Sequence, residues 1–488
     1  MVHSSGTDLL KNMTSFILSP FSDDQSLDNL ISCLYVLKDS GLEIFRTEYL
    51  VKNFLDCVES DVSRAGMHAA AAVTSALLGE DALRCVEFHQ SVISSGSISQ
   101  RQLALLTIGE IGRRSTLDVF HQVFDFIIPL FSDSTLEIRS CAAFAIGHIT
   151  FNQIDSLLPK LVLLMESSSD KQLLFSIVAL KDVLSLCSYS QLSKFAAPMC
   201  SFLYKKFEHP DDDIRQVAAE CVGMITGFDE PTGFASLEPK LSDPNPLVRI
   251  CAASALKHAI SKRSVVFWKE KMSLFLPLLD DKDLAVKQHA FYVLNSICYH
   301  LIDVMLPYIA EIILPKIYAC TSVNPDYIRE VNLGPFQVKV DDGLPLRSSA
   351  FACMSTILDM APHRVDLAEL IRYVSIGFND VDEIQALTYN ILYKLASSHS
   401  SSLLENLDMI PDRIMQSLKA QIKATRGSEP ESARNVLRSA VRALVQVRKI
   451  PKSEESSKFE YLYTRVIKTS TLSHILKEFE EHAPRSAP

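Results

Sequence analysis

Side chains that could perform catalysis or hold a metal ion are numerous in this chain of 488 residues, but they stand apart from one another. The eleven cysteines occur singly, and no two lie within four residues, which argues against a zinc knuckle or a disulfide framework. His148 and His289 fall inside apolar segments, where a packed histidine is expected rather than a ligand. Phosphate-binding glycine loops, His-Glu-x-x-His helices and Gly-x-Ser-x-Gly turns are missing from the sequence. We therefore expect no metal, no cofactor and no catalysis, which leaves recognition as the chemistry to locate.

One segment combines charged and apolar residues in an order suited to recognition. Residues 324–343 read Asn-Pro-Asp-Tyr-Ile-Arg-Glu-Val-Asn-Leu-Gly-Pro-Phe-Gln-Val-Lys-Val-Asp-Asp-Gly. Tyr327–Val331 and Phe336–Val340 are β-branched or aromatic runs with partial alternation, and the stretch between them contains Gly and Pro. This pattern predicts a β-hairpin at about 325–343, with an irregular excursion as the alternative. Because an isolated hairpin is marginal in water, it needs support from the rest of the chain or from a partner.

The remainder of the chain repeats one pattern, a polar turn followed by a basic or amide residue and an Ala-rich apolar helix. The repeats are anchored at Arg101, Arg139, Lys171 (weaker), Arg215, Arg249, Lys287, Arg347 and Gln385. Their separations are 38, 32, 44, 34, 38, 60 and 38 residues. A period near 40 with two helices per unit is the signature of HEAT or armadillo arrays. The sequence therefore predicts an all-α solenoid, a superhelical arch, with the hairpin inserted in its one long interval.

The composition agrees with a solenoid, in which a hydrophobic core grows along one axis. Hydrophobic residues make up 48% of the chain, and Gly is scarce. We expect an N-terminal tail at 1–25, HEAT repeats at 26–324, the hairpin at 325–343, further HEAT repeats at 344–480 and a tail at 481–488. Asp residues before the helices, such as Asp133, Asp213, Asp243 and Asp283, suit helix caps. Because an Arg in the first helical turn opposes the helix dipole, a ladder of Asp–Arg pairs between neighbouring repeats is expected to hold it.

Charge is distributed unevenly along the chain. The net charge is −10, yet residues 413–468 contain 13 Lys and Arg against 5 Asp and Glu, a local +8. Such a basic end could orient a partner during encounter, although Arg434, Arg438 and Arg442 could simply form the solvated stripe of a helix. Nucleic acid is not expected as a partner, because an acidic solenoid would repel phosphates over most of its surface.

Neither a membrane nor secretion is indicated. No apolar run approaches the roughly 18 residues that a membrane span requires, so no membrane contact is expected. The first residues are polar and do not resemble a signal peptide. A cytoplasmic and nuclear location is the expectation.

The long interval also carries a family resemblance. Leu333-Gly-Pro-Phe336, followed by Val340-Asp-Asp-Gly-Leu344 and Arg347, resembles the hairpin region of the cullin-associated and neddylation-dissociated proteins, also called TATA-binding-protein-interacting proteins. The likeness extends upstream through Leu103–Glu110 and Ala143–Ile149, and downstream through Phe351–Met354, Leu387-Thr388 and Arg438–Ala443. It covers about residues 60–480 and matches the C-terminal half of the family.

The resemblance implies a regulator of ubiquitin-ligase assembly that is not an enzyme. Family members wrap an unneddylated cullin with its RING subunit, and the hairpin occupies space needed by the Skp-type adaptor. Members thereby exchange substrate-receptor modules. Known members are more than twice as long as this chain, so a separate chain supplying the N-terminal half is one expectation, and a shortened form or an incomplete gene model is another. Blocking of neddylation by this chain alone is left open.

By position, the resemblance assigns partner contacts to the hairpin. The candidate residues are Arg329, Glu330, Val331, Leu333, Pro335, Phe336, Val338, Lys339, Val340, Asp341 and Asp342. Phe336 and Val338 are the candidates for apolar contacts, and Arg329, Glu330 and Lys339 for polar ones. The alternative function is that of a general HEAT adaptor, such as a karyopherin-like transport receptor or a phosphatase scaffold.

Overall fold

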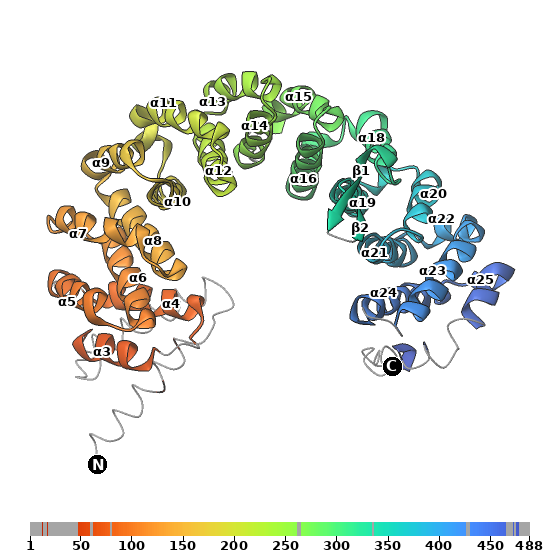
Figure 1. Ribbon diagram of the computed structural model, residues 1–488, viewed down its shortest axis with the longest axis horizontal. Helices are drawn as coiled ribbons and strands as arrows, with labels where there is room; N and C mark the ends of the chain where they lie inside the picture. Colours follow the sequence, from red (N-terminus) through yellow and green to blue (C-terminus); the bar gives the residue numbers. More distant parts are fainter. Residues whose placement is uncertain are drawn as a thin grey trace, which may run out of the picture. The chain divides into compact units, whose positions relative to one another are not determined.

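The computed structural model describes residues 47–58, 62–78, 81–260, 265–333, 336–425, 430–464 and 475–477, with Asn12, Ile17 and Leu472 as single residues. The two predicted tails, apart from Asn12 and Ile17, and residues 26–46 of the predicted HEAT repeats lie outside the described residues. The chain forms two compact units, residues 1–236 and 237–488. In each unit helices follow one another in pairs, and we call the first member of a pair its A helix and the second its B helix (Figure 1).

The first unit is a stack of such pairs, joined in places by short 3₁₀ turns. Its helices are α3 (Thr47–Cys57), α4 (Arg64–Leu77), α5 (Ala82–Ser95), α6 (Ile98–Arg114), α7 (Phe120–Ile127), α8 (Leu136–Asn152), α9 (Ile154–Ser167), α10 (Asp170–Leu186), α11 (Tyr189–Lys205) and α12 (Asp212–Phe228). The B helices α4, α6, α8, α10 and α12 pack successively against one another. α13 (Glu230–Leu237) lies at the boundary of the two units.

The second unit continues the same plan and contains the hairpin. Its helices are α14 (Pro246–Ala259), α15 (Val265–Phe275), α16 (Leu284–His300), α17 (Ile302–Met305), α18 (Leu314–Ala319), α19 (Leu344–Met360), α20 (Leu367–Gly377), α21 (Asp382–Ser398), α22 (Ser400–Glu405), α23 (Pro411–Ala424), α24 (Pro430–Arg448) and α25 (Ser457–Leu462). The B helices α14, α16, α19, α21 and α24 again pack in succession. The strands β1 (Ile328–Leu333) and β2 (Phe336–Asp341) lie between α18 and α19, inside one repeat. The predicted all-α solenoid with one inserted hairpin is confirmed.

The repeated sequence pattern marks the beginning of each B helix. Seven of the eight anchors, from Arg101 to Gln385, are the fourth residue of their helix, and only the weaker Lys171 is the second. Small residues follow the anchor because neighbouring B helices approach closely. A Cβ atom added to Gly112 of α6 would lie 2.6 Å from Cγ1 of Ile149 in α8. These Ala- and Gly-rich faces form the core, where Ala142, Ala143 and Ala253 are fully buried.

Of the four aspartates expected to cap helices, only Asp283 does so, while Thr135 and Asn245 are the N-cap residues of α8 and α14. Asp283 caps α16, accepting hydrogen bonds from the backbone N–H groups of Ala285 and Val286. Asp133 and Asp243 accept from backbone N–H groups in the turns before α8 and α14. The expectation for Asp213 was wrong. Helix α12 begins at Asp212, so Asp211 is its N-cap and Asp213 is the second residue of the helix.

The expected ladder of Asp–Arg pairs exists at three steps. Arg101 contacts Asp133 at 2.7 Å, Arg249 contacts Asp281 at 2.8 Å through two parallel hydrogen bonds, and Arg347 contacts Asp380 at 2.9 Å. Each pair joins the first turn of one B helix to the turn before the next B helix. Elsewhere the sequence supplies different partners. Arg215 pairs with Asp212 of its own helix, and Arg139 lies over the ring of Phe175.

Candidate protein interface

The hairpin is an antiparallel two-stranded ribbon whose two faces differ in chemistry. The pairing runs from Ile328 opposite Asp341 to Leu333 opposite Phe336. Residues opposite each other in such a ladder share a face, and alternate pairs point the same way. Val331 opposite Val338 and Arg329 opposite Val340 therefore lie on one face. The other face is mostly polar, with Glu330 opposite Lys339 and Asn332 opposite Gln337, and it includes Ile328 opposite Asp341.

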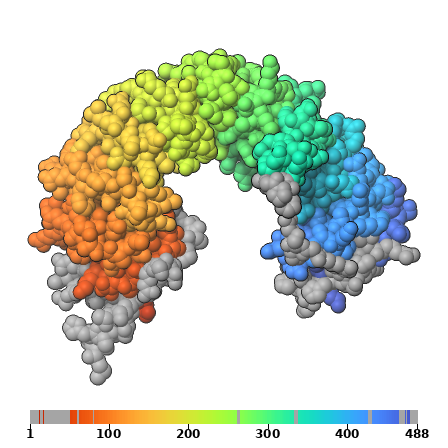
Figure 2. Space-filling view, viewed as in Figure 1, coloured from red at the N-terminus to blue at the C-terminus, as the bar shows by residue number. Residues whose placement is uncertain are grey.

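The first of these faces is mainly apolar, apart from Arg329, and it is accessible. We call it the valine face, defined by Val331, Val338 and Val340. The side chain of Val338 is 41% exposed, while Val331 and Val340 are partly buried. The space-filling view shows the region of the hairpin, in teal, at the molecular surface (Figure 2). The side chains of Leu333 and Phe336, and the whole of Pro335, lie outside the described residues.

The charged hairpin residues are solvated and form weak pairs. Arg329 contacts Asp342 at 2.6 Å, and the Arg side chain is 60% exposed. Lys339 lies 4.0 Å from Glu330, with both side chains largely exposed. Exposed pairs of this kind contribute at most about 1 kcal/mol each. These side chains can therefore exchange their present partners for those of another protein at small cost.

A buried arginine fixes the base of the hairpin. Arg347, in the first turn of α19, donates to Asp341 at the end of β2 at 2.8 Å and to Asp380 of the next repeat. Its side chain is 3% exposed. Burial alone would lower the pKa of Arg347, but the hydrogen bonds to Asp380 and Asp341 outweigh it and raise the pKa. Asp341, a candidate partner contact, is thus engaged inside the molecule.

Two further contacts fix the base of the hairpin, one to the preceding repeat and one within the insertion. Gln288 of α16 donates to the backbone carbonyl of Asp342 at 2.9 Å. Gly343 lies against Tyr327, where an added Cβ atom would be 2.9 Å from the tyrosine ring. Sequence reasoning missed Gln288 and Asp380, because both are distant from the hairpin in the chain. The sequence predicted that Arg347 pairs with an Asp of a neighbouring repeat, but it did not predict the contact of Arg347 with Asp341 of the hairpin.

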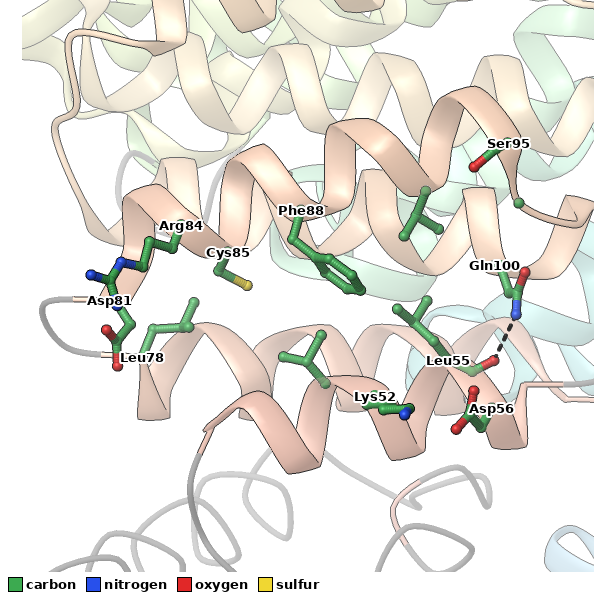
Figure 3. A pocket seen from close by; sticks show the side chains of 13 residues that line it. Lys52, Leu55, Asp56, Leu78, Asp81, Arg84, Cys85, Phe88, Ser95 and Gln100 are labelled. Atoms are coloured by element: carbon green, nitrogen blue, oxygen red, sulfur yellow. Dashed lines mark hydrogen bonds between the residues drawn. The ribbon is translucent and has the colours of Figure 1, made fainter.

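A hollow lies elsewhere, in the first unit. It has a volume of about 670 Å³ and lies between α3 and α5, beside the start of α6 (Figure 3). Leu55, Leu78 and Phe88 give it an apolar lining, and Gln100 closes one end by donating to the carbonyl of Leu55 at 3.1 Å.

A cysteine–histidine pair borders this hollow but is not poised for nucleophilic chemistry. Sγ of Cys85 lies 3.3 Å from Nδ1 of His89. Burial, with help from Asp81, raises the pKa of Cys85 to about 12, and burial lowers the pKa of His89 to about 4. An activated pair needs a lowered cysteine pKa and a raised histidine pKa, which favour the thiolate and the imidazolium. At neutral pH this pair stays neutral.

The described residues contain neither a metal-binding cluster nor a membrane-spanning helix. In the part of the chain that the structure describes, no three His, Cys, Asp or Glu side chains gather in a way that could hold a metal ion. Among the described helices, none combines the length and the apolar character that crossing a membrane requires.

Comparison with known proteins supports the sequence resemblance. Residues 305–467, which include the hairpin, match the family model described as TATA-binding protein interacting. The chain is 26% identical to the cullin-associated NEDD8-dissociated protein 1 of Dictyostelium discoideum, over 92% of this chain and 37% of that protein. The Drosophila melanogaster protein of the same name is 29% identical, over 77% of this chain and 31% of its own length. The chain thus spans about a third of the length of these relatives.

One relative is named as the C-terminal part of a family protein, in agreement with the expectation that this chain matches the C-terminal half of the family. The "C-terminal part" of cullin-associated NEDD8-dissociated protein 1 of Emericella nidulans is 28% identical, over 64% of this chain and 30% of that protein. Among solved structures, Kap95p with RanGDP superposes with a TM-score of 0.58 at 13% identity, over 97% of this chain and 63% of that one. That likeness shows the helical-repeat fold alone. The predicted resemblance to the C-terminal part of the cullin-associated family is confirmed.

Proposed function

We propose that this chain, a relative of the cullin-associated NEDD8-dissociated proteins, binds a cullin and regulates the assembly of cullin–RING ubiquitin ligases without being an enzyme. The observation that carries the proposal is the hairpin with its accessible valine face, fixed by a buried arginine inside the region that matches the family model. A rigid apolar projection is what a protein partner can bind with little loss of entropy.

The proposed mechanism is competition for the N-terminal domain of an unneddylated cullin that carries its RING subunit. The valine face contacts the cullin where a Skp-type adaptor would otherwise bind, and Phe336 is proposed as a further apolar contact. Arg329, Glu330 and Lys339 form the polar rim, where charged groups favour encounter and register more than affinity. Release and rebinding of the adaptor then exchange the substrate-receptor module.

The relatives are about three times as long as the part matched here, so the proposal for this chain does not include the N-terminal half of the family architecture. Covering the site of neddylation is assigned to that half. The cytoplasm and nucleus, where cullin ligases act, are the proposed locations.

The first test measures binding of the full chain to a purified cullin N-terminal domain by calorimetry. Val338→Asp places a charge on the valine face and should weaken binding by about tenfold or more, because a buried unpaired carboxylate is costly. Val266→Asp is the matched control, since Val266 is an exposed valine of α15 outside the hairpin. Equal weakening by both variants, or by neither, would contradict a role for the hairpin.

The second test addresses competition. A pull-down of the chain with the cullin N-terminal domain is repeated in the presence of the adaptor. Recovery should fall as adaptor is added, and deletion of residues 332–339 should abolish the difference. Equal recovery with and without adaptor removes the competition mechanism. The transport-receptor alternative has only the shared fold in its support, and such a receptor should tolerate the deletion.

A further inference from the structure

A second hollow lies in the second unit, and no residue of the hairpin strands lines it. It has a volume of about 480 Å³ and is bounded by three successive B helices, α19, α21 and α24. Polar side chains line much of it, including Ser348, Asn390 and Ser439. Tyr393 of α21 and Arg442 of α24 also contribute to its wall.

Arg442 is held in place without a carboxylate partner. Its guanidinium carbon lies 4.3 Å from the centre of the Tyr393 ring. Within the described residues no Asp or Glu oxygen is within ion-pair distance of Arg442, whereas Arg101 and Arg249 each have one such partner and Arg347 has two. A ring that covers one face of a guanidinium leaves the N–H groups along its edge available to a planar acceptor. The stacking therefore orders the arginine and leaves its hydrogen-bonding capacity unused.

The same side of α24 carries further positive charge. Arg434 and Arg438 precede Arg442 at four-residue intervals and are exposed, while Leu437, Val441 and Leu444 on the opposite side are buried. Residues four apart lie on one helix face. The stripe therefore continues to Arg442 in the wall of the hollow, in a stretch with a local charge of +8 on a chain of net charge −10.

The charges favour a protein carboxylate over a nucleic acid as the occupant. A duplex would bring a continuous row of phosphates, and the rest of the chain, with a net charge of −18, would repel it. A protein segment brings only a few carboxylates and can place them locally. Serine and asparagine groups in the hollow suit a carboxylate, which accepts several hydrogen bonds. Arginine suits it further, because the guanidinium edge binds a carboxylate through two parallel bonds.

We propose that the hollow between α19, α21 and α24 binds an acidic segment of a partner protein, with an Asp or Glu carboxylate paired to Arg442 and the stripe of Arg434 and Arg438 guiding the segment in. Glu383 of α21 also lines the hollow and is exposed. It opposes the incoming charge and restricts where the carboxylate can lie. The site goes beyond the hairpin and does not depend on which protein the hairpin binds.

The test uses an oligoglutamate peptide as the probe and an oligoglutamine peptide as its neutral counterpart, with binding to the full chain followed by fluorescence anisotropy. The glutamate peptide should bind, and more weakly as salt is raised. Arg442→Gln should raise its Kd by about tenfold, because the paired charge is lost. Glu383→Gln should lower the Kd, since a repulsive charge is removed.

Arg372→Gln is the matched control. Arg372 of α20 also lies over a tyrosine ring, that of Tyr373, but it is paired with Glu369 and belongs to an A helix. It should leave the Kd unchanged. Wild-type affinity in Arg442→Gln, equal weakening in Arg372→Gln, or equal binding of both peptides would overturn the proposal. If the wild-type chain does not bind a cullin but binds the glutamate peptide in a way that depends on Arg442, the proposed function is wrong and the proposed carboxylate site is still supported.

Discussion

At the scale of single residues, Arg347 connects recognition to stability. It is the one arginine of the described chain that joins the hairpin, its own repeat and the next repeat, through Asp341 and Asp380. Asp380 is 6% exposed, so removing the arginine leaves a buried carboxylate without its charge partner. Breaking such a pair from one side typically costs about 3–5 kcal/mol.

We therefore expect Arg347→Met to lower the free energy of unfolding by about 3 kcal/mol or more, measured by urea denaturation. Arg372→Met should cost about 1 kcal/mol or less, because the pair of Arg372 with Glu369 is exposed. Similar losses in the two variants would show that the buried clamp does not stabilise the fold.

Buried histidines make the first unit sensitive to acid. Burial, with the positive charges of Arg113 and His68 adding to it, lowers the pKa of His148 to about 3. The unfolded chain, with a pKa near 6.5, takes up the proton first, so stability is lost as pH falls from about 6.5 towards 3. The slope is at most about 1.4 kcal/mol per pH unit for one histidine. Asp182 has the opposite effect on stability between about pH 4 and 6. Burial raises the pKa of its carboxyl to about 6, so the folded chain takes up this proton first and gains stability as pH falls.

His148→Gln removes this titration. The fall in Tm between pH 7 and pH 5 should be smaller in the variant than in the wild type, followed by circular dichroism. His121→Gln, at an exposed position of α7, is the control and should keep the wild-type pH dependence. An unchanged pH dependence in His148→Gln would assign the acid sensitivity to other groups.

At the scale of elements, close packing of B helices limits what their small residues can become. Alanine normally stabilises a helix relative to glycine by about 1 kcal/mol. Gly112→Ala should reverse that sign and destabilise the first unit by about 1–3 kcal/mol, since the added Cβ would lie 2.6 Å from Ile149. Thermal unfolding of the variant shows whether the substitution lowers or raises stability. A gain in stability would mean that α6 and α8 can separate at little cost.

Elements were also the level at which the sequence was most informative. The anchors from Arg101 to Gln385 located the B helices because a local pattern, a turn followed by small apolar residues, forms each helix start. The hairpin was predictable because alternation and a Gly-Pro turn are local as well. The hollow with Tyr393 and Arg442 was not, since these residues are 49 positions apart in the chain and meet only when α24 packs on α21. The sequence showed the stripe of Arg434, Arg438 and Arg442, but it did not show the hollow beside Arg442.

At the scale of the whole molecule, a helical-repeat array distributes its stability locally. Each repeat contacts mainly its neighbours, so a defect in one repeat weakens the repeats around it and spares distant ones. In Gly112→Ala, amide hydrogen exchange should quicken in α4, α6 and α8, while amides of α21 and α24 keep their wild-type protection. Arg347→Met should give the reverse pattern, with faster exchange in α19, α21 and the hairpin. Uniform acceleration along the described chain in either variant would mean that the two units unfold as one cooperative structure. A hairpin carried by such an array can then be strained by a partner without loosening the helices of the first unit.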